Sequence, residues 1–127
     1  MSARGNDTPR RALVVEDDEG ILNLTLTVLR RQGFDVVGAR DGREALDLLR
    51  ADDRYVVIVL DLVLPHVGGT EVIAYLRAHM PATLRRVVVI TAAPKSRVEG
   101  ISEEICVVLR KPFDLEALIR AVESCSA

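Results

Sequence analysis

Short apolar runs alternate with helix-like segments five times along the chain, and this alternation constrains the fold more than any other feature of the sequence. The runs at 56–60 and 87–90 are continuously apolar and rich in β-branched residues, which is typical of strands covered on both faces. Further strands are expected at 12–15, 35–39 and 105–109. Strands that alternate with helices predict a parallel sheet with helices on both faces, so we expect an α/β fold.

Apolar residues at helical spacing follow each run, and capping residues mark the start of several helices. The first helix is expected over 20–31, with Gly33 just beyond its end. Asp41 and Glu44 form a capping-box pattern for the second helix, and Asp114 is placed to cap the last one. The other helical stripes are Ala45, Leu48 and Leu49; Val72, Ile73, Leu76 and Met80; a short stretch at 96–99; and Leu115, Leu118, Ile119 and Val122.

The composition fits one globular domain that buries a sizeable core. The chain has 127 residues, of which 49% are hydrophobic and 28% are charged, and these proportions argue against disorder. Residues 1–9 are polar and are expected to form a flexible tail, so the domain is expected to cover 10–125. The sequence leaves open whether this domain stands alone or belongs to a longer protein.

Charge and hydropathy argue against two classes of partner. The formal net charge of −2 gives no reason to expect nucleic acid. The longest apolar run, at 55–60, is too short to cross a bilayer, and the polar start of the chain lacks the apolar stretch of a signal peptide. We therefore expect a cytoplasmic protein without membrane insertion, in which Cys106 and Cys125 are reduced thiols.

Polar residues follow four of the five expected strands at the point where each strand ends. Glu16 and Asp17 follow the first strand, Asp61 the third, Thr91 the fourth and Lys111 the fifth. In an open parallel sheet, ligands bind outside the carboxyl ends of the strands, near the point where strand order reverses. The pattern therefore predicts a functional site built from three carboxylates, one hydroxyl and one ammonium group.

The chemistry of these groups points to a cation and a phosphoryl group. Three carboxylates that converge cannot all stay ionised without compensation, and Mg²⁺ favours such an oxygen-rich site. A carboxylate such as Asp61 can accept a phosphoryl group to form a mixed anhydride. The cation, Lys111 and Thr91 are the groups expected to balance the added negative charge.

Four segments in this order resemble the response-regulator receiver domains of two-component signalling. They are VVEDD at 14–18, LDLVLP at 60–65, VITA at 89–92 and RKPF at 110–113, and the resemblance covers about residues 10–125. It implies a flavodoxin-like, doubly wound, five-stranded parallel sheet with strand order 2-1-3-4-5. It also implies a signalling domain rather than an enzyme, phosphorylated by a sensor histidine kinase or a phosphotransfer protein.

The resemblance assigns a role to each residue of the expected site. Asp61 is the implied phosphoacceptor. The implied ligands of Mg²⁺ or Mn²⁺ are the carboxylates of Glu16, Asp17 and Asp61 and the backbone carbonyl of Val63. Thr91 and Lys111 are implied to contact the phosphoryl oxygens, and the peptide bond before Pro112 is implied to be cis.

The sequence also departs from the family pattern at three places. Receivers usually carry Tyr or Phe as a switch three residues before the lysine, where this chain has Val108. The segment between Thr91 and Lys111 is about two residues shorter than expected, so the helix near 96–99 is expected to be short, displaced or mobile, and the sequence leaves the conformation of 94–104 open. Val63 and Ala93 flank the path of an attacking water and are apolar, which predicts a phosphorylated state that lasts minutes to hours.

The leading hypothesis is a phosphoacceptor domain whose phosphorylation alters a surface for an unknown downstream protein. The main alternative is a protein-interaction module of the same fold that works without phosphorylation, which the absence of an aromatic residue at Val108 keeps open. A phosphatase with an aspartyl nucleophile is disfavoured because Val63 stands where such enzymes carry a second acid. A flavin carrier is disfavoured because three acids at 16–18 repel phosphate. Formation of a homodimer is left open.

Overall fold

Five parallel strands form one sheet in the order β2-β1-β3-β4-β5 in the computed structural model, which describes residues 10–127. The strands are β1 (Arg11–Val15), β2 (Asp35–Ala39), β3 (Tyr55–Leu60), β4 (Val87–Thr91) and β5 (Val107–Arg110). The predicted α/β class and strand order are confirmed. The tail expected at 1–9 lies outside the described residues.

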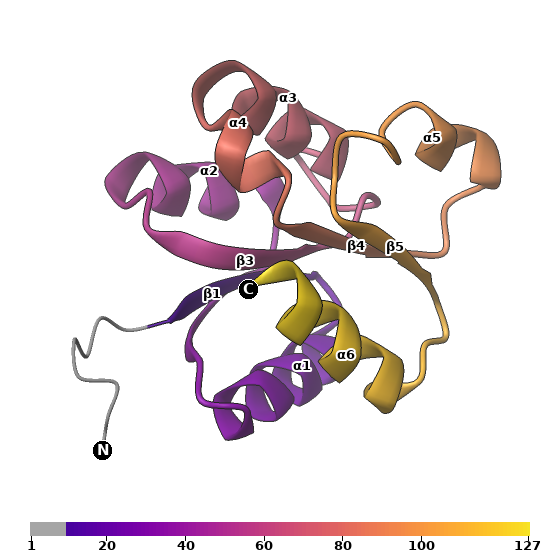
Figure 1. Cartoon of the computed structure of the whole chain (residues 1–127). Helices are drawn as coiled ribbons and strands as arrows, with labels where there is room; N and C mark the ends of the chain where they lie inside the picture. The colour runs from indigo at the N-terminus through magenta and orange to yellow at the C-terminus, as the bar shows by residue number, and fades with distance from the viewer. Residues whose placement is uncertain (1–9) are drawn as a thin grey trace.

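Helices cover both faces of the sheet (Figure 1). They are α1 (Glu19–Arg31), α2 (Gly42–Ala51), α3 (Gly69–His79), α4 (Pro81–Leu84), α5 (Lys95–Glu99) and α6 (Leu115–Cys125). Helices α1 and α6 lie on one face, and α2 to α5 lie on the other. The sheet is therefore the middle layer of three.

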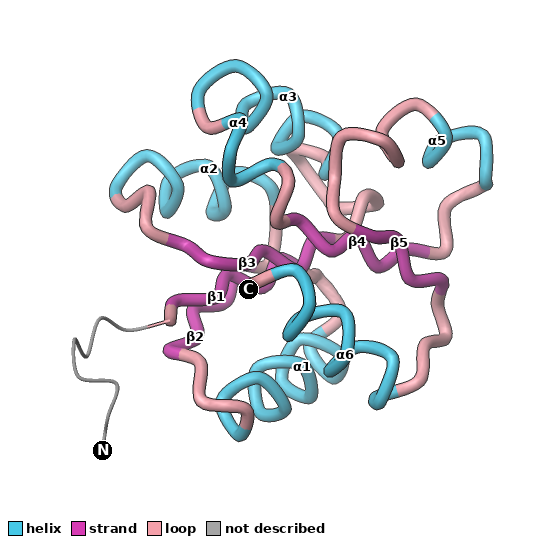
Figure 2. The backbone as a smooth tube through the Cα atoms, in the orientation of Figure 1, coloured by secondary structure: helices cyan, strands magenta, loops and turns pink. Residues whose placement is uncertain are grey.

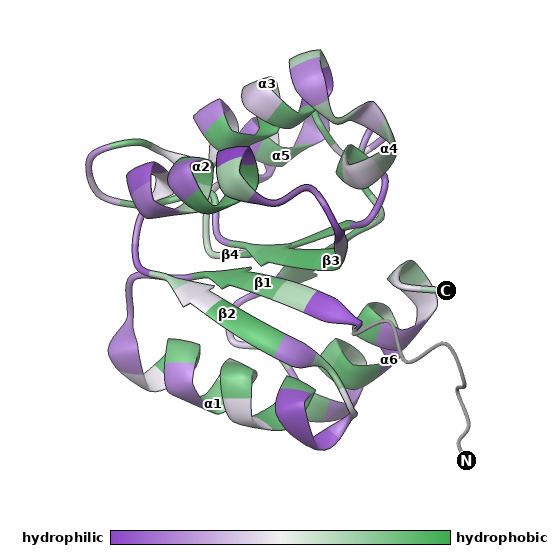
Figure 3. Cartoon of the chain, turned by 90° about the vertical axis from the view of Figure 1, so that its left-hand side faces the viewer, coloured by the Kyte–Doolittle hydropathy of each residue, from purple (hydrophilic) through white to green (hydrophobic). Residues whose placement is uncertain are grey.

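The continuous apolar runs of the central strands follow from this layering. Along β3, Ile58 and Leu60 pack into the core beneath α2 and α3, whereas Val57 and Val59 pack into the core beneath α1 and α6. All four side chains are fully buried. Each contributes about 1.5–3 kcal/mol through burial. Apolar colouring accordingly runs along the strands, while polar residues lie on the outer faces of the helices (Figure 3).

The expected capping residues are in place at the helix starts. Asp18 accepts a hydrogen bond from the backbone N–H of Ile21 at 3.0 Å, and Asp41 accepts one from Glu44 at 2.9 Å. Asp114 caps α6 through the N–H of Glu116. Each bond satisfies a backbone donor that a helix start leaves without a partner.

The connection between β4 and β5 departs from the sequence-based expectation more than the rest of the fold does. The short helix expected at 96–99 is observed as α5, and loop makes up most of the remaining connection (Figure 2). Strand β5 begins two residues later than predicted, because Ile105 packs into the core before the strand starts. The single turn of α4 after Met80 was not predicted.

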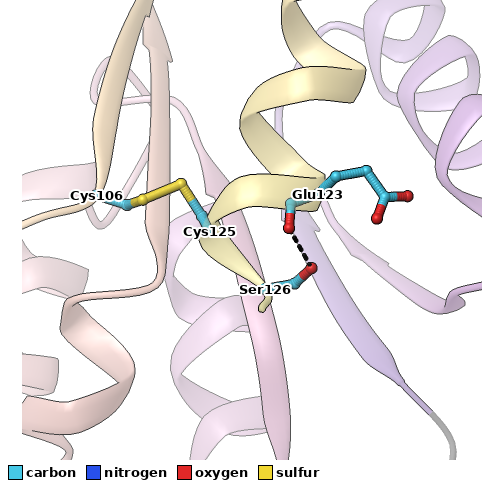
Figure 4. Close-up of a disulfide and its surroundings, with 4 residues drawn as sticks. All are labelled: Cys106, Glu123, Cys125 and Ser126. Carbon is cyan, nitrogen blue, oxygen red and sulfur yellow. Dashed lines mark hydrogen bonds between the residues drawn. A yellow bond between two sulfur atoms is a disulfide. The ribbon is translucent and has the colours of Figure 1, made fainter.

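The prediction that the two cysteines are reduced thiols is wrong for this structure. Cys106 and Cys125 form a disulfide, with their Cα atoms 6.0 Å apart (Figure 4). Cys106 immediately precedes β5, and Cys125 is the last residue of α6. The two meet because α6 runs back along the sheet to the level at which β5 begins, a return that sequence spacing alone does not reveal.

Candidate functional site

The register of the sheet brings the predicted site residues to one edge. Strands β1 and β3 pair Val15 with Leu60, the last residue of each strand. Glu16 and Asp61 are the residues that immediately follow. The N–H of Asp61 donates to the carbonyl of Val15 at 3.1 Å, which continues the ladder into the site. The backbone thus places these two carboxyl groups side by side.

The same logic positions the hydroxyl and the ammonium. Strands β4 and β5 pair Thr91 with Arg110, and the N–H of Lys111 then donates to the carbonyl of Thr91 at 3.0 Å. The peptide bond between Lys111 and Pro112 is cis, the geometry that the family resemblance implies. The turn after β5 therefore starts at the site itself.

A single ammonium lies between the two buried acids. The Nζ atom of Lys111 is 2.8 Å from Oδ2 of Asp61 and 2.9 Å from Oε1 of Glu16. Glu16 is 0% exposed and Asp61 is 4% exposed, so both carboxyl groups are largely removed from water. The contact between Lys111 and Glu16 was not expected from the sequence, which suggested only a role toward phosphate.

Burial and charge shift the titration of this pair. Burial raises the pKa of the Glu16 carboxyl above its usual value, against the opposing effects of the hydrogen bond and charge of Lys111. Burial alone would lower the pKa of Lys111, but the hydrogen bonds and charges of Asp61 and Glu16 outweigh it and raise that pKa. The ammonium therefore stays charged at neutral pH.

Backbone donors hold the remaining carboxylate oxygens. Oδ1 of Asp61 accepts a hydrogen bond from the N–H of Val63 at 3.1 Å, and Oε2 of Glu16 accepts one from Asp18 at 3.0 Å. Each carboxylate is thus bonded through one oxygen to its own loop and faces Lys111 with the other. Their orientation is set before any ligand arrives.

An open pocket of about 530 Å³ lies over these groups. Its lining includes Glu16, Asp17, Asp61, Lys111 and the loop that follows β4. Thr91 is fully buried and is not among the residues that line this pocket; its Oγ1 accepts a hydrogen bond from the N–H of Ala93 at 3.0 Å. The Val63 side chain is 51% exposed at the pocket, whereas Ala93 is 3% exposed.

The acids form a donor set that suits a hard divalent cation. Carboxylate oxygens of Glu16, Asp17 and Asp61 all lie within 4.8 Å of one another. Asp17 is exposed, so that one donor of the three is open to solvent. Mg²⁺ prefers carboxylates combined with waters, and this arrangement supplies the carboxylates beside a pocket that is open to solvent. The role of the Val63 carbonyl as a further ligand stays a prediction.

Gly69 contributes to the site in a way that sequence analysis missed. It begins α3, and a Cβ atom at this position would lie 2.3 Å from the carbonyl oxygen of Asp61 and 2.6 Å from the Cα of Leu62. The helix can approach the backbone of the phosphoacceptor candidate only because the side chain is absent. The available signal is the Gly68–Gly69 pair in the loop that follows β3, and two adjacent glycines before a helix favour only a turn.

Within residues 10–127, no helix is both long enough and apolar enough to cross a membrane.

Comparison with known families gives a match over nearly the whole chain. A family model described as the response regulator receiver domain matches residues 12–123. The response regulator MprA of Mycolicibacterium vanbaalenii is 39% identical over 116 residues, which cover 87% of this chain and 48% of the relative. The transcriptional regulatory protein TrcR of Mycobacterium tuberculosis is 33% identical, over 91% of this chain and 45% of its own length. The chain thus spans about half the length of these relatives.

Solved structures agree with this match. A CheY-like response regulator receiver domain protein from Methanospirillum hungatei aligns with a TM-score of 0.85 over 94% of both chains, and its 21% identity supports the fold alone. The response regulator TrrA of Thermotoga maritima, solved in complex with Mg²⁺ and BeF, aligns with a TM-score of 0.80 at 26% identity. That alignment covers 91% of this chain and 98% of TrrA.

Proposed function

Since the chain belongs to the response regulator receiver domains of two-component systems, we propose that it accepts a phosphoryl group on Asp61 from a phosphohistidine donor. The donor is a sensor histidine kinase or a phosphotransfer protein. The observation that carries the proposal is the contact of Asp61 with Lys111, beneath an open pocket and beside two further acids. The domain acts as a signalling switch that assists its own phosphorylation, and it is not a turnover enzyme.

The proposed transfer is an in-line displacement at phosphorus. A carboxylate oxygen of Asp61 forms the new O–P bond while the N–P bond to the donor imidazole breaks, and the imidazole leaves with the electron pair of that bond. The product is an acyl phosphate. Lys111 already contacts Asp61 and carries the positive charge that the incoming oxygens require. Thr91 offers its hydroxyl to the same oxygens from the end of β4.

The acids would hold Mg²⁺ or Mn²⁺ during this transfer. Glu16, Asp17 and Asp61 supply carboxylates within 4.8 Å of one another, and the carbonyl of Val63 is the further ligand that the family resemblance suggests. When bound, the cation balances the negative charge of the phosphoryl oxygens. Glu16 holds its place through the hydrogen bond from the Asp18 N–H, and Asp17 faces the solvent from which the ion arrives.

Phosphorylation is proposed to alter a protein-binding surface. The downstream partner is unidentified, and homodimer formation and a cytoplasmic location stay predictions. A relative of about twice this length is named a transcriptional regulatory protein, so the charge-based exclusion of nucleic acid is not supported for a longer protein that contained this domain.

The alternative of a phosphorylation-independent module rests on Val108 alone and is not favoured by the complete set of site residues.

Intact-mass measurement with acetyl phosphate and Mg²⁺ tests the proposal. The wild-type chain is expected to gain the mass of one phosphoryl group, and Asp61→Asn is expected to gain none. Asp53→Asn is the matched control, because Asp53 is exposed and follows α2, away from the site. Chelation of the cation is expected to prevent the gain. If Asp61→Asn were modified as readily as Asp53→Asn, the acceptor would be another residue.

A further inference from the structure

The disulfide lies far along β5 from the phosphoacceptor candidate and takes no part in the proposed transfer. Cys106 precedes the first residue of β5, whereas Lys111 follows the last one. Cys125 ends α6, with Ser126 and Glu123 beside it in the last turn (Figure 4). The bond therefore joins the beginning of an edge strand to the end of the helix that follows it.

The two cysteine residues differ in their exposure to solvent. Cys106 is exposed, whereas Cys125 is 6% exposed and belongs to the core beneath α1 and α6. Thiol–disulfide exchange requires a thiolate to reach one of the two sulfurs, and the exposed side of this bond offers that approach. A small thiol can thus attack at Cys106 while Cys125 leaves as the buried thiol.

The side chains of the segment that the bond closes are partly open to solvent at its two ends. Strand β5 has four residues, lies at the sheet edge and has half-buried or exposed side chains throughout. The end of α6 is held by Arg10, whose contacts to Glu123 at 3.5 Å and Ser126 at 3.2 Å are both exposed. Exposed ion pairs of this kind contribute little. The covalent bond therefore adds to the backbone pairing of β5 with β4, which includes the N–H of Cys106 donating to the Val87 carbonyl at 2.9 Å, and to the burial of Val122 at the end of α6.

We propose that Cys106 and Cys125 form a reversible redox site that clamps the end of α6 to the start of β5. Two molecules of a low-molecular-weight thiol reduce the disulfide to two cysteine thiols and leave as one small disulfide. The reverse exchange with a small disulfide restores the bond and releases the two thiols. In the dithiol form, β5 and the last turn of α6 open independently and more often.

The cytoplasmic location proposed for this domain favours a reversible disulfide over a permanent one. Disulfides in a reducing cytoplasm are usually transient, catalytic or sensing. The clamped segment spans a sequence separation of 19 and includes Lys111, so the redox state acts on the strand that leads directly into one of the site residues. This redox site goes beyond the phosphoryl-transfer proposal, and its chemistry does not require Asp61.

Three samples of the full chain test the proposal: oxidised wild type, wild type equilibrated with reduced glutathione, and Cys106→Ser. Alkylation with a maleimide, read by intact mass, counts the free thiols. We expect none in the oxidised sample, two after glutathione treatment, and none again after return to oxidised glutathione. Both open samples are expected to melt about 10 °C lower than the oxidised one, as closure of a loop of this length predicts.

Amide hydrogen exchange locates the effect. Faster exchange in the open samples is expected at 107–110 and 122–126, with no change in β1 and β3. A bond that resists glutathione would make the disulfide a fixed structural link and overturn the proposal, as would two alkylated thiols before any reduction. Equal exchange and melting in all samples would show that there is no clamp. Since no phosphodonor is used, these outcomes are independent of whether Asp61 is phosphorylated.

Discussion

At the carboxyl edge of the sheet, Glu16 and Asp61 are buried and share the ammonium of Lys111, whereas the side chains of β5 next to it are half-buried or exposed. The first region is held by charge contacts, backbone donors and strand register together. The second consists of a four-residue edge strand, the five-residue helix α5 and a long loop. A buried charged cluster tolerates little change, because a lost partner leaves a charge without compensation.

The carboxyl edge of the sheet holds the groups proposed for phosphoryl transfer, whereas the region around β5 holds the position at which receivers usually relay the signal. Among the groups proposed to accept and balance the phosphoryl group, Lys111 is in contact with both Asp61 and Glu16. Val108 occupies the position at which receivers usually carry an aromatic switch, and it packs half-buried against the core. We therefore expect changes at the carboxyl edge to affect phosphorylation strongly and changes around β5 to leave it nearly intact.

Removal of the shared ammonium is expected to have the largest effect. Lys111→Ala leaves the buried Glu16 and Asp61 carboxylates without their common partner. The rate of phosphoryl incorporation from acetyl phosphate should fall by about 100-fold, as when one preorganised charge-stabilising donor is lost. Lys95→Ala removes an exposed lysine of α5 and is expected to leave the rate unchanged. Equal rates of incorporation for the two variants would show that Lys111 has no special role in phosphoryl transfer.

Close backbone packing beneath the site gives the next largest effect. Gly69→Ala places a Cβ 2.3 Å from the Asp61 carbonyl oxygen and should reduce the free energy of unfolding by about 2 kcal/mol, measured by urea denaturation. In Gly100→Ala the new Cβ meets nothing within 4 Å at a φ of −70°, so stability is expected to rise slightly. A neutral Gly69→Ala would show that the loop after β3 moves freely.

A polar side chain at the mouth of the pocket should shorten the phosphorylated lifetime. Val63 is half-exposed there and cannot orient an attacking water. Val63→Asn supplies an amide that can, so decay after removal of the donor should be about tenfold faster. Thr70→Asn, exposed at the start of α3, is the control with an unchanged half-life. A wild-type half-life of seconds would contradict the expectation of slow decay.

The smallest effect on phosphorylation is expected at Val108. Val108→Ala removes half-buried contacts on an edge strand and should destabilise the domain by about 1 kcal/mol. The ion pairs that Lys111 makes with Asp61 and Glu16 do not involve Val108, so the incorporation rate should stay within about twofold of wild type. Parallel measurement of melting and incorporation checks both statements. A tenfold loss of rate would mean that β5 shapes the site through its packing.

The sequence was sufficient to predict the features that depend on strand ends. Because parallel strands end at one edge, the acids after β1 and β3 and the lysine after β5 were expected together, and the structure places them in contact. Contacts that depend on how a helix folds back onto the sheet were not predictable from the sequence. Cys125 reaches Cys106 only through the length and direction of α6, and Gly69 meets the Asp61 carbonyl only because the start of α3 packs against the loop after β3.

The direct contact between Lys111 and Glu16 was missed for a related reason. Sequence spacing showed that both residues belong to the site, but not which acid the ammonium reaches before phosphate arrives. The single turn of α4 was also missed, because a helix of four residues that begins with a proline carries too little helical periodicity to be recognised.

Chemical mapping of the modified residue tests the central claim most directly. An acyl phosphate is reduced by borohydride to an alcohol, which converts a phosphorylated aspartate to homoserine. After phosphorylation with Mg²⁺ and acetyl phosphate, reduction and proteolysis, mass spectrometry should find homoserine at position 61 of the wild-type chain. Homoserine at another aspartate, with position 61 unchanged, would contradict the assignment of Asp61 as the phosphoacceptor.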